Sequence, residues 1–106
     1  MLIREEEKNG LSLLYIEGDM TIYTAAELKS ELMTYLVKPV EREINLSGIS
    51  EMDSAGLQIL ILAKREALRL GMLLRLSGHS RAVLEVLDLC NLTAYFGDPL
   101  VISPGA

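Results

Sequence analysis

The residue best placed to take part in chemistry is Ser54, which stands in the sequence Asp53-Ser54-Ala55-Gly56 at the expected start of a helix. As an N-cap, its oxygen would accept a free backbone N–H group of the first helical turn. As a modification site, it would place a phosphate where free N–H groups and the positive end of the helix dipole favour negative charge. The residues alone leave both interpretations open.

Residue types that commonly serve catalysis or metal binding are few. His79 is the single histidine, and its place between Gly78 and Ser80, just before an expected helix, favours a capping or solvent-facing role. Cys90 is the single cysteine and lies among apolar residues, as a small buried side chain would. No G-x-S-x-G motif surrounds Ser54, and the sequence has no glycine-rich phosphate loop. These features predict a protein that is not an enzyme and that binds no cofactor or metal.

Composition narrows the class of protein further. The chain has 106 residues with 10 Lys and Arg against 15 Asp and Glu, a net charge of −5, and half of it is hydrophobic. That length and apolar content predict one globular domain over residues 1–106. The acidic balance argues against direct binding to nucleic acid. No apolar run is long enough for a membrane span, no signal peptide is evident, and one cysteine cannot form an internal disulfide. We therefore expect a cytoplasmic location without membrane insertion.

The first element that must position Ser54 is a β-hairpin. Two strand patterns, Leu2 to Glu7 and Leu11 to Glu17, flank Asn9-Gly10, a dipeptide typical of tight hairpin turns. In the second pattern apolar residues occupy both faces, so we expect part of this strand, including Leu13, to be buried on both sides.

Three helices and two more strands are expected after the hairpin. Thr24 and Glu27 fit a capping box before a helix that ends at Lys38, ahead of Pro39. The helix after Asp53 is expected to run to about Leu70, with an apolar first half. The remaining expected elements are strands over Arg42 to Leu46 and Met72 to Leu76, a helix over Arg81 to Leu89 capped by Ser80, and a short last strand over Leu100 to Ile102.

This order of elements indicates an α/β fold. The hairpin contributes antiparallel pairing, whereas a strand, a crossover helix and another strand favour parallel pairing. The prediction is a mixed β-sheet with helices packed against it. Leu57 and Ile61, from the apolar start of the second helix, are expected in the core together with Leu13.

The segment from Ile44 to Gln58 resembles the signature of the STAS domains of the anti-sigma factor antagonist family, which also occur at the C-terminus of sulphate transporters. In that family a strand of the type I-x-N/D-L precedes a loop and then M-D-S-x-G-L. Three further matches extend the resemblance over nearly the whole chain: Gly18-Asp19-Met20 with Thr24 to Leu28, the glycine-led Gly71 to Leu76, and Ser80, Val83 and Leu87 with the Leu89 to Leu92 turn.

The resemblance implies the STAS fold and a binding protein rather than a catalyst. It implies that Ser54 is phosphorylated by a partner that is an anti-sigma factor with serine kinase activity, and that a phosphatase reverses the reaction. The unphosphorylated form would bind that partner and free a sigma factor. One difference from the family is Thr21, which stands where many signalling members carry an aspartate.

The turn after Gly18 is expected to approach the start of the second helix and to form the partner-binding surface with it. Within that surface, apolar anchors would lie inside a polar rim. An alternative remains open, namely a constitutive STAS subunit of a phospholipid-trafficking ABC transporter, or a STAS partner in chemotaxis or biofilm signalling. The expected partner-binding residues are Met20, Ile22, Met52, Asp53, Ser54 and Gln58.

Overall fold

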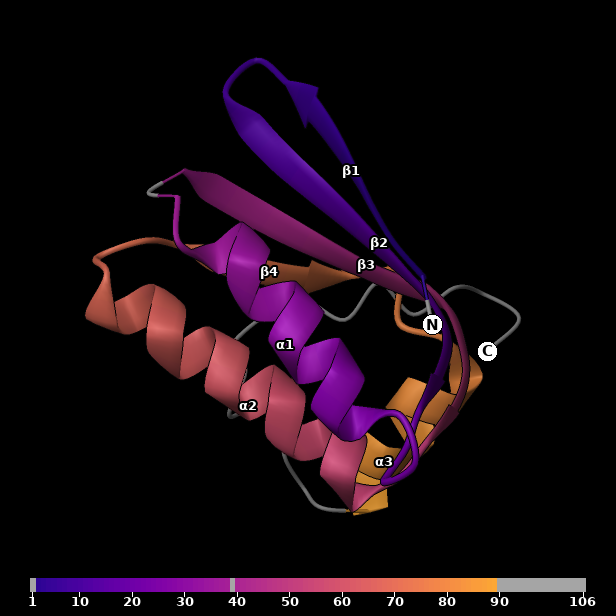
Figure 1. The fold of residues 1–106 in the computed structure, drawn as a ribbon. Helices are drawn as coiled ribbons and strands as arrows, with labels where there is room; N and C mark the ends of the chain where they lie inside the picture. Colours follow the sequence, from indigo (N-terminus) through magenta and orange to yellow (C-terminus); the bar gives the residue numbers. More distant parts are fainter. Residues whose placement is uncertain (1, 39, 90–106) are drawn as a thin grey trace.

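The computed structural model describes residues 2–38 and 40–89 of the chain. The order of elements is β-β-α-β-α-β-α, as the sequence predicted (Figure 1). Cys90 and the last strand expected over Leu100 to Ile102 lie outside the described residues. The described elements are β1 (Leu2–Lys8), β2 (Leu11–Met20), α1 (Ala25–Leu36), β3 (Glu41–Met52), α2 (Ser54–Arg69), β4 (Leu74–Ser77) and α3 (Arg81–Leu89).

The strands form one mixed sheet in the order β1-β2-β3-β4. β1 and β2 pair antiparallel through the predicted turn, in which Asn9 and Gly10 both have positive φ, 51° and 81°. β2 pairs parallel with β3, and β3 pairs parallel with β4. The predicted hairpin and the predicted parallel pairing are both confirmed.

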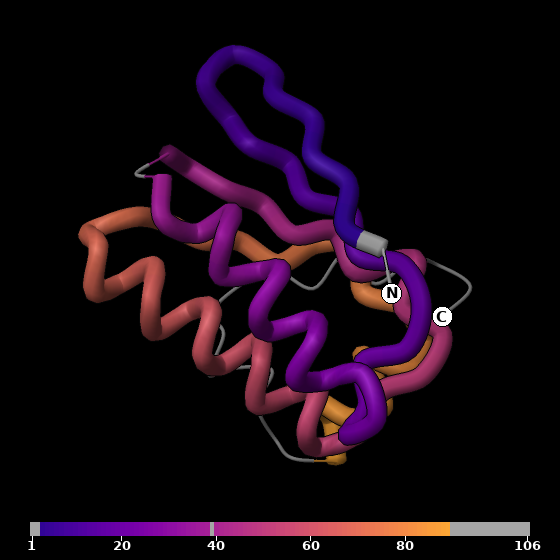
Figure 2. The backbone as a smooth tube through the Cα atoms, in the orientation of Figure 1, coloured from indigo at the N-terminus to yellow at the C-terminus, as the bar shows by residue number. Residues whose placement is uncertain are grey.

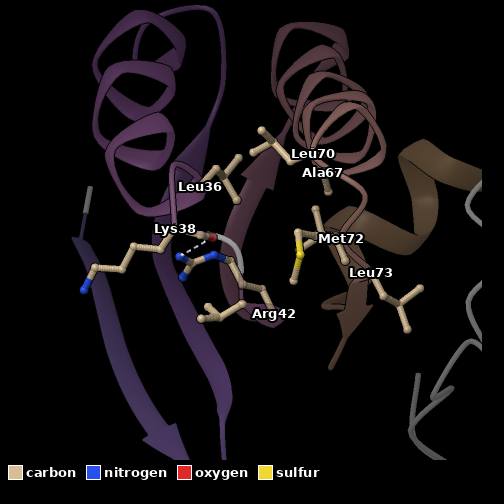
Figure 3. Close-up of a pocket in the computed structure, with 9 residues that line it drawn as sticks. Leu36, Lys38, Arg42, Ala67, Leu70, Met72 and Leu73 are labelled. Atoms are coloured by element: carbon tan, nitrogen blue, oxygen red, sulfur yellow. Dashed lines mark hydrogen bonds between the residues drawn. The ribbon is translucent and has the colours of Figure 1, made fainter.

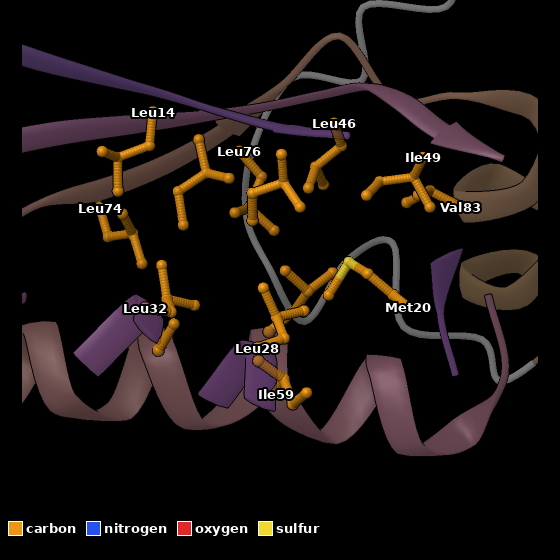
Figure 4. Packing of buried hydrophobic residues seen from close by; sticks show 14 of the residues in the cluster. Leu14, Met20, Leu28, Leu32, Leu46, Ile49, Ile59, Leu74, Leu76 and Val83 are labelled. Atoms are coloured by element: carbon orange, nitrogen blue, oxygen red, sulfur yellow. The ribbon is translucent and has the colours of Figure 1, made fainter. Parts of the chain in front are cut away.

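Helices α1 and α2 lie side by side across one face of the sheet, and α3 lies near the end where β2 and β3 finish (Figures 1 and 2). The core fills the space between that face and the two helices (Figure 4). Its centre consists of fully buried aliphatic side chains, which come from strands and helices that alternate along the chain. They include Leu14, Ile16, Leu28, Leu32, Ile44, Leu46 and Leu60.

The three core residues expected from the sequence differ in their burial. Leu57 is buried at 3% exposure, whereas Ile61 is half-buried and packs against the edge of the core. Leu13 is also half-buried, because the side chains of β2 alternate and only the Leu14 and Ile16 face meets the helices. The expectation that Leu13 belongs to the core is therefore wrong.

Several boundaries of the strands differ from those predicted from the sequence. β3 is twelve residues long and continues to Met52, well beyond Leu46, and β4 starts at Leu74 rather than Met72. α2 begins and ends as predicted, with Gly71 after it at φ 71°. The Ser80 hydroxyl accepts the N–H of Val83 at 3.3 Å, so the predicted cap of α3 is present.

The capping box predicted for α1 does not form. The Thr24 hydroxyl donates to the Asp19 carbonyl at 2.7 Å and accepts the Thr21 N–H at 3.0 Å. The Thr24 N–H bonds to the carbonyl of Thr21. Because both polar groups of Thr24 serve the loop before the helix, neither is available for the exchange with Glu27 that a capping box requires.

A polar network crosses the sheet on its helix-covered face, near the C-terminal end of α1. Arg42 is only 3% exposed, and its Nη1 atom donates to the Ser12 hydroxyl at 2.9 Å. Ser12 in turn donates to Glu5 at 2.6 Å. Figure 3 shows the Arg42 guanidinium reaching back to the carbonyl of Lys38, 3.4 Å away. The network therefore connects β1, β2 and β3 with the residues that follow α1.

None of the described helices is both long and apolar enough to cross a membrane. Within residues 2–38 and 40–89 there is also no group of three or more His, Cys, Asp or Glu side chains that could hold a metal ion.

Candidate functional site

The candidate site forms where two neighbouring parallel strands end. Met20, the last residue of β2, is paired with Met52, the last residue of β3. Because β2 and β3 run in the same direction, the segments that leave them emerge at the same edge of the sheet. The loop of residues 21–24 therefore lies beside the N-terminus of α2, where Ser54 stands.

Asp53, and not Ser54, caps α2. Its backbone is extended, and one carboxylate oxygen accepts the N–H groups of Ala55 at 2.9 Å and Gly56 at 3.2 Å. The other oxygen accepts the Ile22 N–H at 2.9 Å. These bonds, the one from Ile22 first, lower the pKa of Asp53 below its ordinary value. A single carboxylate thus closes the helix and holds the neighbouring loop.

Ser54 is the first residue of α2, and its side chain is exposed. Among the described residues, the Ser54 hydroxyl takes part in no hydrogen bond. The interpretation of Ser54 as the N-cap is therefore wrong, because Asp53 already accepts the N–H groups of the first turn. The hydroxyl is left open to solvent and to a modifying partner.

Met20 cannot serve as the exposed anchor expected from the sequence. Its relative exposure is 0%, and its side chain points into the core near Leu28 and Ile59 (Figure 4). The backbone of α2 passes so close that a Cβ atom at Gly56 would collide with the Met20 carbonyl and lie 2.8 Å from the Met20 Cβ. Met20 therefore packs in the core beneath the site and is not part of the exposed surface.

The other expected contact residues do reach the surface to different degrees. Ile22 is 70% exposed and Gln58 is exposed, whereas Met52 and Asp53 are half-buried. Tyr23 was not predicted from the sequence and, at 95%, is the most exposed large hydrophobic side chain within residues 3–38 and 40–89. An aromatic residue beside Ile22 in a short loop between a strand and a helix was the signal that could have identified it.

The loop that carries Ile22 and Tyr23 is held in place by hydrogen bonds. Besides the bond from Ile22 to Asp53, the Thr21 hydroxyl accepts the Tyr23 N–H at 3.3 Å. On the adjacent strand the Ser50 hydroxyl donates to the Asp19 carboxylate at 2.7 Å. The exposed apolar side chains are therefore presented from a constrained backbone, which limits the entropy that a partner would have to remove on binding.

His79 is 5% exposed, in the turn between β4 and α3. The solvent-facing role considered for it is thus wrong. The buried imidazole is therefore not part of the exposed surface on which Ser54 lies.

The chain belongs to the STAS domain family, because the family model described as "Mlab, STAS domain" matches residues 3–102. Solved structures agree with this fold. An anti-sigma factor antagonist from Mycobacterium paratuberculosis aligns with a TM-score of 0.76 at 22% identity, over 98% of this chain and 87% of the other. RsbS from Moorella thermoacetica, solved as a serine-to-glutamate variant, aligns with a TM-score of 0.72 at 20% identity, over 97% and 88%.

A third similar structure is the Bacillus cell fate determinant SpoIIAA in its phosphorylated form. It aligns with a TM-score of 0.66 at 14% identity, over 98% of this chain and 95% of the other. At these identities the likeness establishes the fold. The mixed sheet with its packed helices is therefore the STAS fold.

Proposed function

We propose that this protein is a cytoplasmic anti-sigma factor antagonist, a binding protein without catalytic activity that is switched by phosphorylation of Ser54. Its partner would be an anti-sigma factor with serine kinase activity, and a phosphatase would restore the unmodified form. The observation that carries the proposal is the exposed Ser54 hydroxyl at a helix N-terminus whose cap is already supplied by Asp53.

Asp53 caps the helix and Ser54 would carry the phosphate, and these separate roles suit a switch. A phosphate on Ser54 would add a charge of about −1.5 to −2 at the surface. It would stand next to the Asp53 carboxylate and near Glu51, which is exposed at the end of β3. Since Asp53 holds the helix cap and the Ile22 loop, the domain would keep its fold while the charge of the contact surface changes.

The contact surface of this proposal consists of exposed or half-exposed residues around Ser54. Ile22 and Tyr23 supply apolar area, and Gln58 lies one helical turn after Ser54 on the outer side of α2. Met52 and Asp53 complete the surface between the loop and the helix. Interfaces commonly combine such apolar anchors with a polar rim.

The deciding experiment measures the affinity of an identified partner for the protein fully phosphorylated at Ser54 and for the unmodified protein. The partner is obtained by pull-down from the native host, with mass spectrometry of both the captured protein and the Ser54 peptide. We expect the phosphorylated form to bind more weakly. Ser54→Asp should lose part of the affinity, whereas Ser54→Ala should bind and resist phosphorylation. Ser30→Asp, which places the same charge on an exposed serine of α1, should bind as the parent does.

The family model that matches this chain is described by the name Mlab and not as an anti-sigma factor antagonist, and this observation favours a second candidate function. In that alternative the protein is a constitutive subunit of a larger complex, such as a phospholipid-trafficking ABC transporter, or a partner in chemotaxis or biofilm signalling. Equal affinity of the phosphorylated and unmodified forms would exclude the switch and support this alternative.

A further inference from the structure

An open groove of about 640 Å³ lies beside the site and shares Met52 and Asp53 with it. One wall is the loop that carries Tyr23, the floor is the end of β3 around Met52, and the other wall is α3. The contribution of α3 was not expected from the sequence, because its residues are about 30 positions away from Ser54 along the chain.

The lining of this groove is acidic. Four of its lining residues are acidic, and among the lining residues that the structure describes none is Lys or Arg. Two of the carboxylates already have hydrogen-bond partners, since Asp19 accepts from Ser50 and Asp53 accepts from Ile22. Glu51 and Glu85 are exposed, and Glu85 forms an exposed ion pair with Arg81 of the same helix at 3.7 Å. Four carboxylates against this one neighbouring guanidinium leave the groove with a net negative charge. An acidic surface of this kind attracts cationic groups and repels anionic ones.

The groove also exposes apolar area. Tyr23 is 95% exposed on one wall and Leu89 is 85% exposed on the other, while Met52 and Val86 are half-buried between them. Apolar side chains grouped in a concave surface mark a binding site more often than scattered ones do. The groove therefore combines apolar anchors with an acidic rim.

We propose that this groove docks a segment of a protein partner in which apolar side chains are flanked by lysines or arginines. The inference rests on the proposed function in that the groove is continuous, through Met52 and Asp53, with the partner surface around Ser54. It adds Asp19, Glu85, Val86 and Leu89 to that surface.

Charge complementarity favours such a segment over two other occupants. Residues 90–106 of the chain follow Leu89 directly, but they contain no Lys or Arg and carry the acidic Asp98. A second copy of the chain has the same net charge of −5 and is repelled overall. A basic and apolar segment is attracted by the rim and can bury Tyr23 and Leu89 together.

The probe that tests this proposal is a synthetic peptide with paired leucines flanked by arginines. It is titrated into the full-length isotope-labelled protein and followed by NMR. We expect saturable binding with shifts confined to the groove, including the amides of Thr21, Ser50 and Val86. A peptide with glutamates in place of the arginines, and one with serines in place of the leucines, should each bind at least about tenfold more weakly.

Matched variants separate the groove from general attraction to an acidic protein. Leu89→Ser and Glu51→Lys should each lower the affinity for the basic peptide by roughly tenfold. The controls are Leu68→Ser, at a comparably exposed leucine of α2, and Glu41→Lys, at the opposite end of β3 from Glu51; both should bind as the parent does. Equal weakening by variant and control, shifts outside the groove, or contacts from residues 91–106 to Tyr23 in the free protein would overturn the proposal.

Failure here can be told apart from failure of the switch. Ser54 is not among the groove residues, so Ser54→Asp should leave the affinity for the basic peptide unchanged or raise it. The whole partner, in contrast, should lose affinity on phosphorylation because it also covers Ser54 and Gln58. If the partner binds the phosphorylated and unmodified forms equally but the basic peptide binds in the groove, the switch is excluded and the groove proposal stands. If phosphorylation weakens the partner but the peptide does not bind in the groove, only the groove proposal is excluded.

Discussion

Asp53 shows how one side chain can leave its neighbour available for function. Aspartate and serine are equally good N-cap residues, so the dipeptide Asp53-Ser54 offers two candidates for one role. Asp53 takes it because its backbone is extended, at φ −126° and ψ −172°, while Ser54 is already helical. The carboxylate also holds the Ile22 N–H. As a result the serine hydroxyl, which a kinase would need, has no structural task among the described contacts.

At the residue scale we predict that Ser54→Ala is nearly neutral for stability, within about 0.5 kcal/mol of the parent. Asp53→Ala should lower the melting temperature more, since the N–H groups of Ile22, Ala55 and Gly56 lose their acceptor. Asp53→Asn should fall between the two because asparagine keeps the cap. Thermal and urea unfolding measure all three. A loss in Ser54→Ala as large as in Asp53→Ala would contradict the assignment of the cap.

At the scale of elements, the site depends on how closely the start of α2 approaches the end of β2. The N–H of Asp53 bonds to the Met20 carbonyl at 3.2 Å, and Gly56 faces the same peptide group one helical turn later. A glycine in a helix usually costs stability, but here the absence of a side chain lets the two backbones touch. That contact brings the 21–24 loop and Ser54 onto one surface.

We therefore predict that Gly56→Ala destabilises the protein by about 1–3 kcal/mol, the usual cost of overpacking. Helix propensity alone predicts the opposite sign, a gain of up to about 1 kcal/mol. The measurement is the free energy of unfolding in urea. Ala55→Gly, the reverse change at the preceding residue, provides the comparison, since it should cost only the propensity difference. A stabilised Gly56→Ala variant would show that the contact with Met20 is looser than described.

At the scale of the whole molecule, polar contacts join the strands at the end of the sheet opposite the site, beside the aliphatic core. Glu5, Ser12 and Arg42 join three strands, and Arg42 also reaches the Lys38 carbonyl after α1. The Ser12 hydrogen bond is the largest influence that lowers the pKa of Glu5, and the Arg42 guanidinium adds to it against the opposing effect of burial. The folded state therefore prefers the ionised carboxylate.

The pH dependence follows from that direction. Because folding lowers the pKa of Glu5, its contribution to stability is present above the ordinary value of 4.5 and is lost as the pH falls through the lower folded value. We predict that Glu5→Gln is less stable than the parent at neutral pH by roughly 1–3 kcal/mol and loses less stability on acidification. Glu7→Gln, on the same strand but exposed, should unfold like the parent. Urea unfolding at several pH values checks both, and parallel pH curves for Glu5→Gln and the parent would contradict the role of the network.

Much of the fold and part of the site could be predicted from the sequence, because the signals are local. Asn9-Gly10 specifies a tight turn whatever surrounds it, and the spacing of apolar residues determines α2 within one residue of its observed ends. The same local patterns placed Ser54 at the start of a helix and Ile22 in the adjacent loop. The order of strands and helices then implied the mixed sheet.

Tertiary structure alone decided the rest, because those features depend on residues far apart in the chain. Met20 is buried since α2 packs against it through Gly56, which is 36 positions away. The Thr24 hydroxyl serves the loop instead of the helix because the Asp19 carbonyl lies within reach. Leu13 is half-buried because both long helices cover the opposite face of the sheet, and α3 completes a groove beside a loop from the first quarter of the chain. Periodicity and propensity describe neighbours along the chain, whereas burial and shared hydrogen bonds arise only when distant segments meet.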